Sequence, residues 1–250
     1  MTSAVYQTPV TLSPSRISNF RTCPLQFRFA SIEKLPQPPQ IHLVKGNFVH
    51  RVLELLLGHE PEHRTVEAAR KAFDETRAEY EPSARFTALG LSPDASEAFF
   101  KDSRELVNGY YRMENPRNAK IIGLELRIDS DFGKFKLGGI IDRLEYNEKN
   151  ELVVSDYKTG KVPDARFGAN KMDNMHIYAS LCLRERGELP KRLRLMYLKS
   201  STPIEVEVTA ESNAACEAAA IQTFEKIETS CESGIFATKK SGLCNFCAYK

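Results

Sequence analysis

A short apolar strand that ends in charged residues constrains the fold of this chain most strongly. The run Leu152, Val153 and Val154 predicts a buried strand. Side chains alternate faces along a strand, so Asp156 and Lys158 continue the row that Leu152 and Val154 begin. A charge on such a row needs a partner or a metal ion. Taken alone, the stretch fits either an Asp156–Lys158 ion pair or a metal-binding carboxylate beside a phosphate-facing lysine.

A second acid lies on the preceding predicted strand, across a short turn from Asp156. It is Asp142, and its predicted row carries apolar residues, namely Ile140, Leu144 and Tyr146. Carboxylates on neighbouring strands repel one another unless a cation lies between them. Mg²⁺ and Mn²⁺ prefer carboxylate oxygen, so the pair indicates a hard divalent ion. Taken alone, Asp142 is also compatible with a salt bridge to Arg143 or with a turn position.

Other residues give weaker signals for a site. Gly138 and Gly139 would let a substrate backbone approach the second strand closely. His50 lies on a predicted helix over 41–57, where a single histidine is usually a surface or core residue. Glu125 shares its predicted strand face with Gly123 and Arg127, which is equally compatible with a solvated acid.

The composition is that of an ordinary globular protein. Of 250 residues, 42% are apolar and 27% are charged, and the formal net charge is +2. That charge is too small to indicate nucleic acid or a membrane surface, so any basic patch must be local. No apolar run approaches the roughly 20 residues that a membrane span needs, and the N-terminal segment lacks the features of a secretory signal. We therefore expect a cytoplasmic protein whose six cysteines are thiols or metal ligands.

The periodicity of the chain changes from helical to strand-like near its middle. Helices are predicted from Pro14 toward Cys23 and over 41–57, 65–81 and 93–113, and the last two form a helical lobe before the sheet. Strands are predicted over 120–128, 134–146 and 151–158, which suggests an antiparallel meander. A helix over 169–186, strands over 193–198 and 204–208, and a helix over 210–233 complete an α/β (α+β) chain.

Several motifs in this order resemble the PD-(D/E)XK nuclease superfamily. They are Gly46-x-x-x-His50, Glu125, Gly139-x-x-Asp142-Arg143 and Asp156-Tyr157-Lys158-Thr159-Gly160. The most specific part is GGIIDRLE followed by VVSDYKTG, and the chain looks most like the branch with the RecB C-terminal nuclease domain and the CRISPR-associated exonucleases. The resemblance implies a restriction-endonuclease-like core, with a central mixed sheet flanked by helices. It also implies one nuclease domain over 1–250, a helical insertion at 60–116, and a tail at 234–250 that packs on the N-terminal helix.

The resemblance implies roles for the site residues. Asp142 and Asp156 would bind a divalent metal, Mg²⁺ or Mn²⁺, with His50 and the backbone carbonyl of Tyr157 as further ligands. Lys158 would orient the attacking water or stabilise developing charge.

Two further positions match the family in part. Glu125 corresponds to an acid that some members use near the metal. The helix after the last motif carries Gln-x-x-x-Tyr in this branch; here Tyr178 fits, but Asn174 stands where Gln is expected, with His176 nearby.

The function implied is a metal-dependent DNA nuclease in repair, recombination or a related pathway. An exonuclease on single strands or duplex ends fits best, leaving 5′ phosphates and 3′ hydroxyls. The sequence contains no helicase P-loop, so a helicase or other DNA-processing partner would be another chain. The alternative is a DNA-binding or bridging subunit with a weak or vestigial site.

The cysteines fall into two groups. We interpret Cys182, Cys216 and Cys231 as buried or inert thiols in helices. The resemblance implies that Cys23, Cys244 and Cys247 ligate a 4Fe-4S cluster, with zinc less favoured. The fourth cysteine of that pattern is not among the 250 residues, and the alternative is that these three cysteines bind nothing.

Overall fold

A six-stranded mixed sheet forms the centre of the molecule. The computed structural model describes residues 5–163 and 165–249, and for 165–171 the backbone only. The strand order is β1-β3-β4-β5-β6, and β2 pairs with β3. The strands are β1 (Thr11–Leu12), β2 (Lys120–Asp131), β3 (Lys136–Tyr146), β4 (Leu152–Lys158), β5 (Arg192–Tyr197) and β6 (Thr202–Glu207). Strands β2, β3 and β4 pair antiparallel, as the meander predicts, whereas β4 and β5 are parallel.

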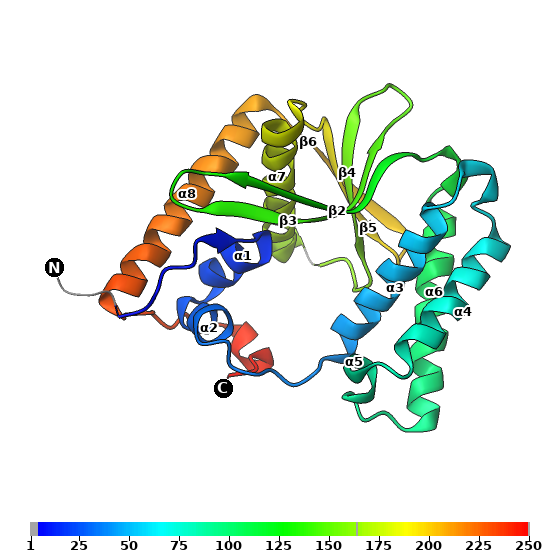
Figure 1. The fold of residues 1–250 in the computed structure, drawn as a ribbon, viewed down its shortest axis with the longest axis horizontal. Coiled ribbons are helices and arrows are strands. Elements are labelled where there is room, and N and C mark those ends of the chain that lie inside the picture. The colour runs from blue at the N-terminus through cyan, green and yellow to red at the C-terminus, as the bar shows by residue number, and fades with distance from the viewer. Residues whose placement is uncertain (1–4, 164, 250) are drawn as a thin grey trace.

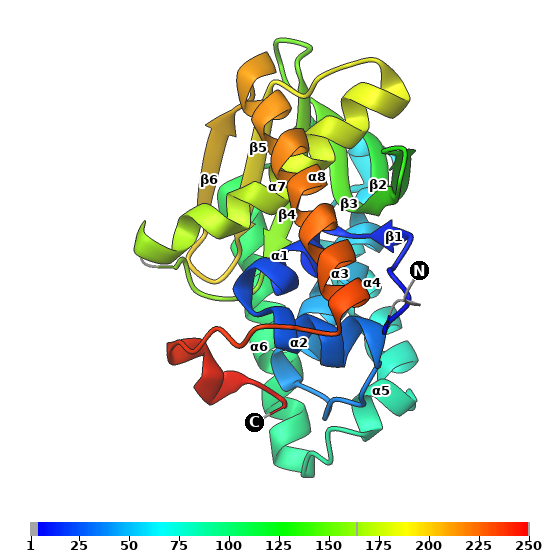
Figure 2. The ribbon, with the colours of Figure 1, turned by 90° about the vertical axis from the view of Figure 1, so that its left-hand side faces the viewer.

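Helices cover both faces of this sheet (Figure 1). Helices α1, α7 and α8 lie on one side, and α3, α4 and α6 lie on the other, as Figure 2 shows from the side. Their bounds are α1 (Pro14–Thr22), α2 (Pro24–Phe27), α3 (Ile41–Leu57), α4 (Val66–Tyr80), α5 (Ala84–Thr87), α6 (Pro93–Met113), α7 (Ala165–Arg186) and α8 (Ala210–Ser233). The predicted α/β fold, a central mixed sheet flanked by helices, is confirmed.

Local sequence signals account for several helix ends. The side chains of Ser13, Thr65, Ser92 and Thr209 each accept a hydrogen bond from the backbone amide three residues later. Helix α8 ends at Gly234, whose φ of 75° lies in the left-handed region that glycine tolerates. These caps explain why the sequence locates the helices to within a few residues.

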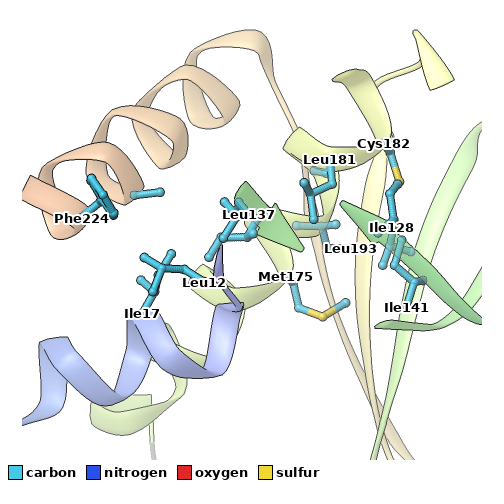
Figure 3. Packing of buried hydrophobic residues seen from close by; sticks show 14 of the residues in the cluster. Leu12, Ile17, Ile128, Leu137, Ile141, Met175, Leu181, Cys182, Leu193 and Phe224 are labelled. Carbon is cyan, nitrogen blue, oxygen red and sulfur yellow. The ribbon is translucent and has the colours of Figure 1, made fainter. Parts of the chain in front are cut away.

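Each face of the sheet has its own hydrophobic core. On the first face, Figure 3 shows Leu12, Ile17 and Phe224 gathered around Leu137 of β3. On the second face, the ring of Phe48 in α3 packs edge-on against four other aromatic rings, with centroids 5.1–5.9 Å apart. These rings belong to Phe73, Tyr80, Phe99 and Phe100. The lobe helices are thereby fixed to the sheet that bears the predicted site.

A buried ionic cluster joins β3 to the end of α6. Arg143 is fully buried, and its guanidinium pairs with Glu114 and, at 2.8 Å, with Glu145. Burial disfavours the charged guanidinium, but the neighbouring acids outweigh it and raise the pKa of Arg143. Arg143 therefore faces away from Asp142, so the alternative of a salt bridge between them is wrong.

Two boundaries and one buried position differ from the sequence predictions. Strand β2 continues to Asp131, and α7 begins at Ala165, four residues before the predicted start at 169. Ile140 is 43% exposed, so the prediction that it shares a buried row with Asp142 is wrong. The division into one nuclease domain with an insertion at 60–116 stays a prediction. Within the described ranges, no helix has both the length and the apolar character to cross a bilayer.

Candidate metal and catalytic site

The two predicted carboxylates lie where β3 and β4 separate. The antiparallel ladder runs from the pair Tyr146–Leu152 to the pair Arg143–Ser155. Asp142 and Asp156 would be the next pair in this register. The Asp142 carboxylate instead accepts a hydrogen bond from the Tyr157 amide at 2.8 Å, while β4 stays paired with β5 through Lys158. The side chain of Asp142 thus replaces a ladder bond and opens a space between the strands.

His50 reaches this space from helix α3. Its Nε2 lies 3.0 Å from the carbonyl oxygen of Tyr157, and its Nδ1 lies 3.4 Å from the Asp142 carboxylate. The same nitrogen is 3.7 Å from Glu125. Burial disfavours the imidazolium, but the charge of Asp142 and hydrogen bonds to Asp142 and Glu125 outweigh it and raise the pKa of His50. The imidazole of His50 therefore lies within ion-pair distance of two carboxylates, those of Asp142 and Glu125.

Glu125 joins the group through an irregular backbone in β2. Its φ is 42°, in the left-handed region, where a non-glycine residue within a strand is strained by about 1–3 kcal/mol. The β2–β3 register shifts between Ile121 and Gly123, so the strand does not keep a simple two-residue alternation. An isolated glycine in a strand often marks a bulge, so Gly123 could have indicated this one. The strained backbone directs Glu125 toward His50.

Asp156 and Lys158 form a close pair at the end of β4. The Lys158 ammonium lies 2.5 Å from the Asp156 carboxylate, and the Asp156 side chain is 16% exposed. Burial and the charge of Asp142 raise the pKa of Asp156 to about 6, although Lys158 and His50 oppose this. Burial disfavours the ammonium of Lys158, but Asp156 outweighs it and raises the pKa of Lys158, so the lysine stays charged. The ion pair between Asp156 and Lys158 is therefore confirmed, and the metal-binding role of Asp156 stays a prediction.

Tyr178 packs on β3 next to the carboxylates. A Cβ added at Gly139 would lie 2.8 Å from the Tyr178 ring, so only glycine lets the ring sit this close to the strand. Burial and the charges of Asp156 and Asp142 raise the pKa of Tyr178, which keeps its phenol protonated. Asn174, one turn earlier on α7, instead lines a separate cavity of about 350 Å³ with Ser18.

Three side chains from three elements could hold a metal ion. One ligand atom each from His50, Glu125 and Asp142 lies within 4.8 Å of the others. One nitrogen and two carboxylate oxygens suit a divalent cation of the Mg²⁺ or Mn²⁺ type. The raised pKa of His50 reflects the negative charge of the gathered acids, and a bound cation would replace this proton, because histidine ligates a metal as neutral imidazole. Asp156 lies outside this group of three and turns toward Lys158.

The cysteines are all free thiols in this structure. Cys182 and Cys231 are buried and Cys216 half-buried, and burial raises the pKa of each, as expected for unreactive thiols. The C-terminal tail lies beside α2 (Figures 1 and 2), and the Leu25 amide donates to the Ala237 carbonyl at 3.3 Å. Ligation of an iron–sulfur cluster stays a prediction; its candidate ligands Cys23 and Cys247 are half-buried and Cys244 is exposed.

Comparisons with known proteins agree with this geometry. The sequence profile of the PD-(D/E)XK nuclease superfamily matches residues 11–250. The crystal structure of a protein from Eubacterium rectale, described as a candidate exonuclease, superposes with a TM-score of 0.62 at 11% identity, over 96% of this chain and 88% of that one. The crystal structure of SSO0001 matches with a TM-score of 0.45 at 14% identity, over 97% and 85%. A search of curated proteins gives no match.

The structural likeness to the Eubacterium rectale protein shows a shared fold alone, since the identity is 11%. The profile match extends over nearly the whole chain and includes β2, β3 and β4, the strands that carry the carboxylates. PD-(D/E)XK nucleases are hydrolases that use divalent metals, which the gathered donors could bind. This chain therefore belongs to the PD-(D/E)XK nuclease superfamily.

Proposed function

We propose that this nuclease hydrolyses phosphodiester bonds of DNA, with Mg²⁺ or Mn²⁺, from strand or duplex ends. The observation that carries the proposal is the convergence of His50, Glu125 and Asp142 beside the Asp156–Lys158 pair. Three acids and two basic groups in one opening give both donors for a cation and positive charge for a phosphate. Repair or recombination is the setting that fits such an activity best, with a helicase or other DNA-processing protein as a partner.

The chain's own residues divide the work of the reaction. His50, Glu125 and Asp142 would hold the ion, with Asp156 and the Tyr157 carbonyl beside them. An ion held by these residues would supply activation of a water molecule and positive charge for the phosphate oxygens. The β3–β4 ladder ends at the pair Arg143–Ser155, so these donors lie beyond its last pair.

Lys158 places a fixed positive charge next to the reacting phosphate. Its ammonium is held by Asp156 at 2.5 Å, and its raised pKa keeps it charged at neutral pH. A preorganised cation of this kind stabilises the charge that develops on the phosphate in the transition state. Tyr178, which is protonated and packs on Gly139, is placed to orient the substrate strand.

The test is degradation of end-labelled linear DNA by purified protein with Mg²⁺, with Mn²⁺ and with EDTA. We expect cleavage with either metal and none with EDTA. We expect Lys158→Gln and Asp142→Asn each to lower kcat at least about 100-fold, in line with the loss of one electrostatic catalytic group. Asp129→Asn, an exposed acid on β2, is the matched control and should keep the wild-type rate.

A circular single strand separates the two modes of cleavage. An exonuclease leaves the circle intact, so rapid cutting of it would contradict action from ends. Equal rates for Lys158→Gln and the wild type would sink the assignment of the site. DNA binding without metal-dependent cleavage would instead indicate a vestigial site.

A further inference from the structure

A small basic cavity adjoins the end of β4 on the side of the helical lobe. It measures about 290 Å³, and its lining includes Lys45, Arg112, Lys199 and Thr159. Thr159 follows Lys158 directly, so the cavity begins one residue beyond the catalytic strand. We propose that it binds a second phosphate of the nucleic-acid strand, next to the phosphate that is cleaved. This inference rests on the proposed function.

Two glycines bring the walls of the cavity together. A Cβ at Gly109 of α6 would collide with the Leu198 carbonyl, so α6 lies directly on the turn between β5 and β6. A Cβ at Gly46 of α3 would lie 3.6 Å from the Thr159 hydroxyl, so α3 closely approaches the end of β4. These contacts set the relative positions of the backbone segments from which the three basic side chains extend.

The turn that carries Lys199 is joined to the catalytic strand. The Leu198 amide donates to the Lys158 carbonyl at 2.9 Å, which continues the β4–β5 pairing by one bond. Ser201 has a φ of 51°, a strained conformation for a non-glycine residue. Its hydroxyl accepts a hydrogen bond from Nε of Arg112 at 3.0 Å. Arg112 thereby holds the turn through its Nε.

The charges of the cavity favour an anion at its centre. Lys45 is 20% exposed in its side chain and pairs at 3.0 Å with Asp102, whose side chain is 67% exposed. The two acids of the lining, Asp102 and Glu105, are exposed. Three cations against two acids leave a net positive cavity beside Lys158 in a chain whose overall net charge is +2.

A phosphate of the strand is the anion whose size and charge suit this position. Lysine and arginine on a phosphate position a strand without reading its sequence. Such a contact would fix the strand relative to the site and allow cleavage of any sequence. The phosphate could be internal or could be the terminal 5′ phosphate, and the two are separable by experiment.

The first experiment measures binding without cleavage. The probe is a fluorescent single-stranded oligonucleotide in EDTA, titrated by anisotropy at several salt concentrations. Each phosphate contact on a single strand adds about 0.7 to the slope of log K against log salt. We expect Lys199→Gln to lower that slope by about 0.7, whereas Lys101→Gln, an exposed lysine on α6, should keep it. An unchanged slope for Lys199→Gln, or an equal change for both variants, contradicts the proposal.

The second experiment locates the phosphate by its charge. Oligonucleotides with one neutral methylphosphonate next to the cleaved bond, and oligonucleotides with or without a 5′ phosphate, are compared by kcat/KM. We expect one of these modifications to lower kcat/KM of the wild type. The same modification should lower kcat/KM of Lys199→Gln much less, because that variant has already lost the contact. Equal sensitivity in both proteins overturns the assignment. Since the first experiment needs no cleavage, a Lys199-dependent slope in an inactive protein would refute the nuclease and leave this cavity standing.

Discussion

Replacing Asp156 by asparagine should stabilise the metal-free protein. Burial and the charge of Asp142 raise the pKa of Asp156 from its ordinary 3.8 to about 6. One pKa unit corresponds to 1.36 kcal/mol, so keeping this carboxylate charged costs about 3 kcal/mol at neutral pH. Asparagine has nearly the same shape and no charge, but it deprives Lys158 of its partner. That lysine is 31% exposed and keeps part of its hydration, so we expect a net gain of about 1–2 kcal/mol.

The sign of the effect gives a pH signature. Between about pH 4 and pH 6 the folded protein keeps a proton on Asp156 that the unfolded chain has lost. The free energy of unfolding of the wild type therefore falls as the pH rises through this window, and Asp156→Asn removes that fall. The variant should match the wild type below pH 4 and exceed it above pH 6.

Urea denaturation in EDTA at pH 4 and pH 7.5 measures this difference. Asp129→Asn, which removes an exposed acid from β2, should leave the free energy of unfolding unchanged at both. Mg²⁺ should then stabilise the wild type more than Asp156→Asn, because an ion that binds only the folded state adds RT ln(1 + [M]/Kd). A variant less stable than the wild type at pH 7.5 in EDTA would show that the Asp156–Lys158 pair stabilises the fold, and would refute this reasoning.

Two further predictions concern residues around the site. Arg143→Met should lower the free energy of unfolding by about 3 kcal/mol in urea titrations, because the buried Glu145 loses its nearer cation and keeps only Arg194, at 3.4 Å. Adding Glu145→Gln should restore part of the loss, and full stability of the single variant would contradict this. Gly139→Ala should displace Tyr178 and lower kcat at least about tenfold, while the circular dichroism spectrum stays that of the wild type. Gly242→Ala is the control, because its added methyl group would extend into open space, and it should change neither kcat nor the spectrum.

The sequence predicts the carboxylates of the site well, because strand alternation is a local rule. It places Asp156 on the row of Leu152 and Val154, and it places Asp142 on the neighbouring strand. Arg143 pairs with Glu114 and Glu145 and so does not partner Asp142.

The sequence does not predict Glu125 as clearly, because the local rule fails there. Its φ of 42° and the register shift at Gly123 turn its side chain, and both depend on how β2 fits against β3 and α3. Helical periodicity does not predict the position of His50 either, because it does not indicate against which part of the sheet a helix packs. Only the resemblance to the nuclease superfamily predicts that His50 lies beside Asp142 and Asp156. Local sequence patterns also do not predict features built by tertiary contacts, such as the basic cavity of Lys45, Arg112 and Lys199.

The site where β3 and β4 separate is assembled from segments that lie far apart in the chain. His50 and Tyr157, which touch at the opening, are 107 residues apart in the chain. The parallel pairing of β4 with β5 must also wait until α7 has crossed between them. Bringing such distant segments together requires closing long loops, which costs entropy and slows folding. A growing or partly folded chain therefore lacks the assembled site, and cleavage of nucleic acid begins only when the fold is complete.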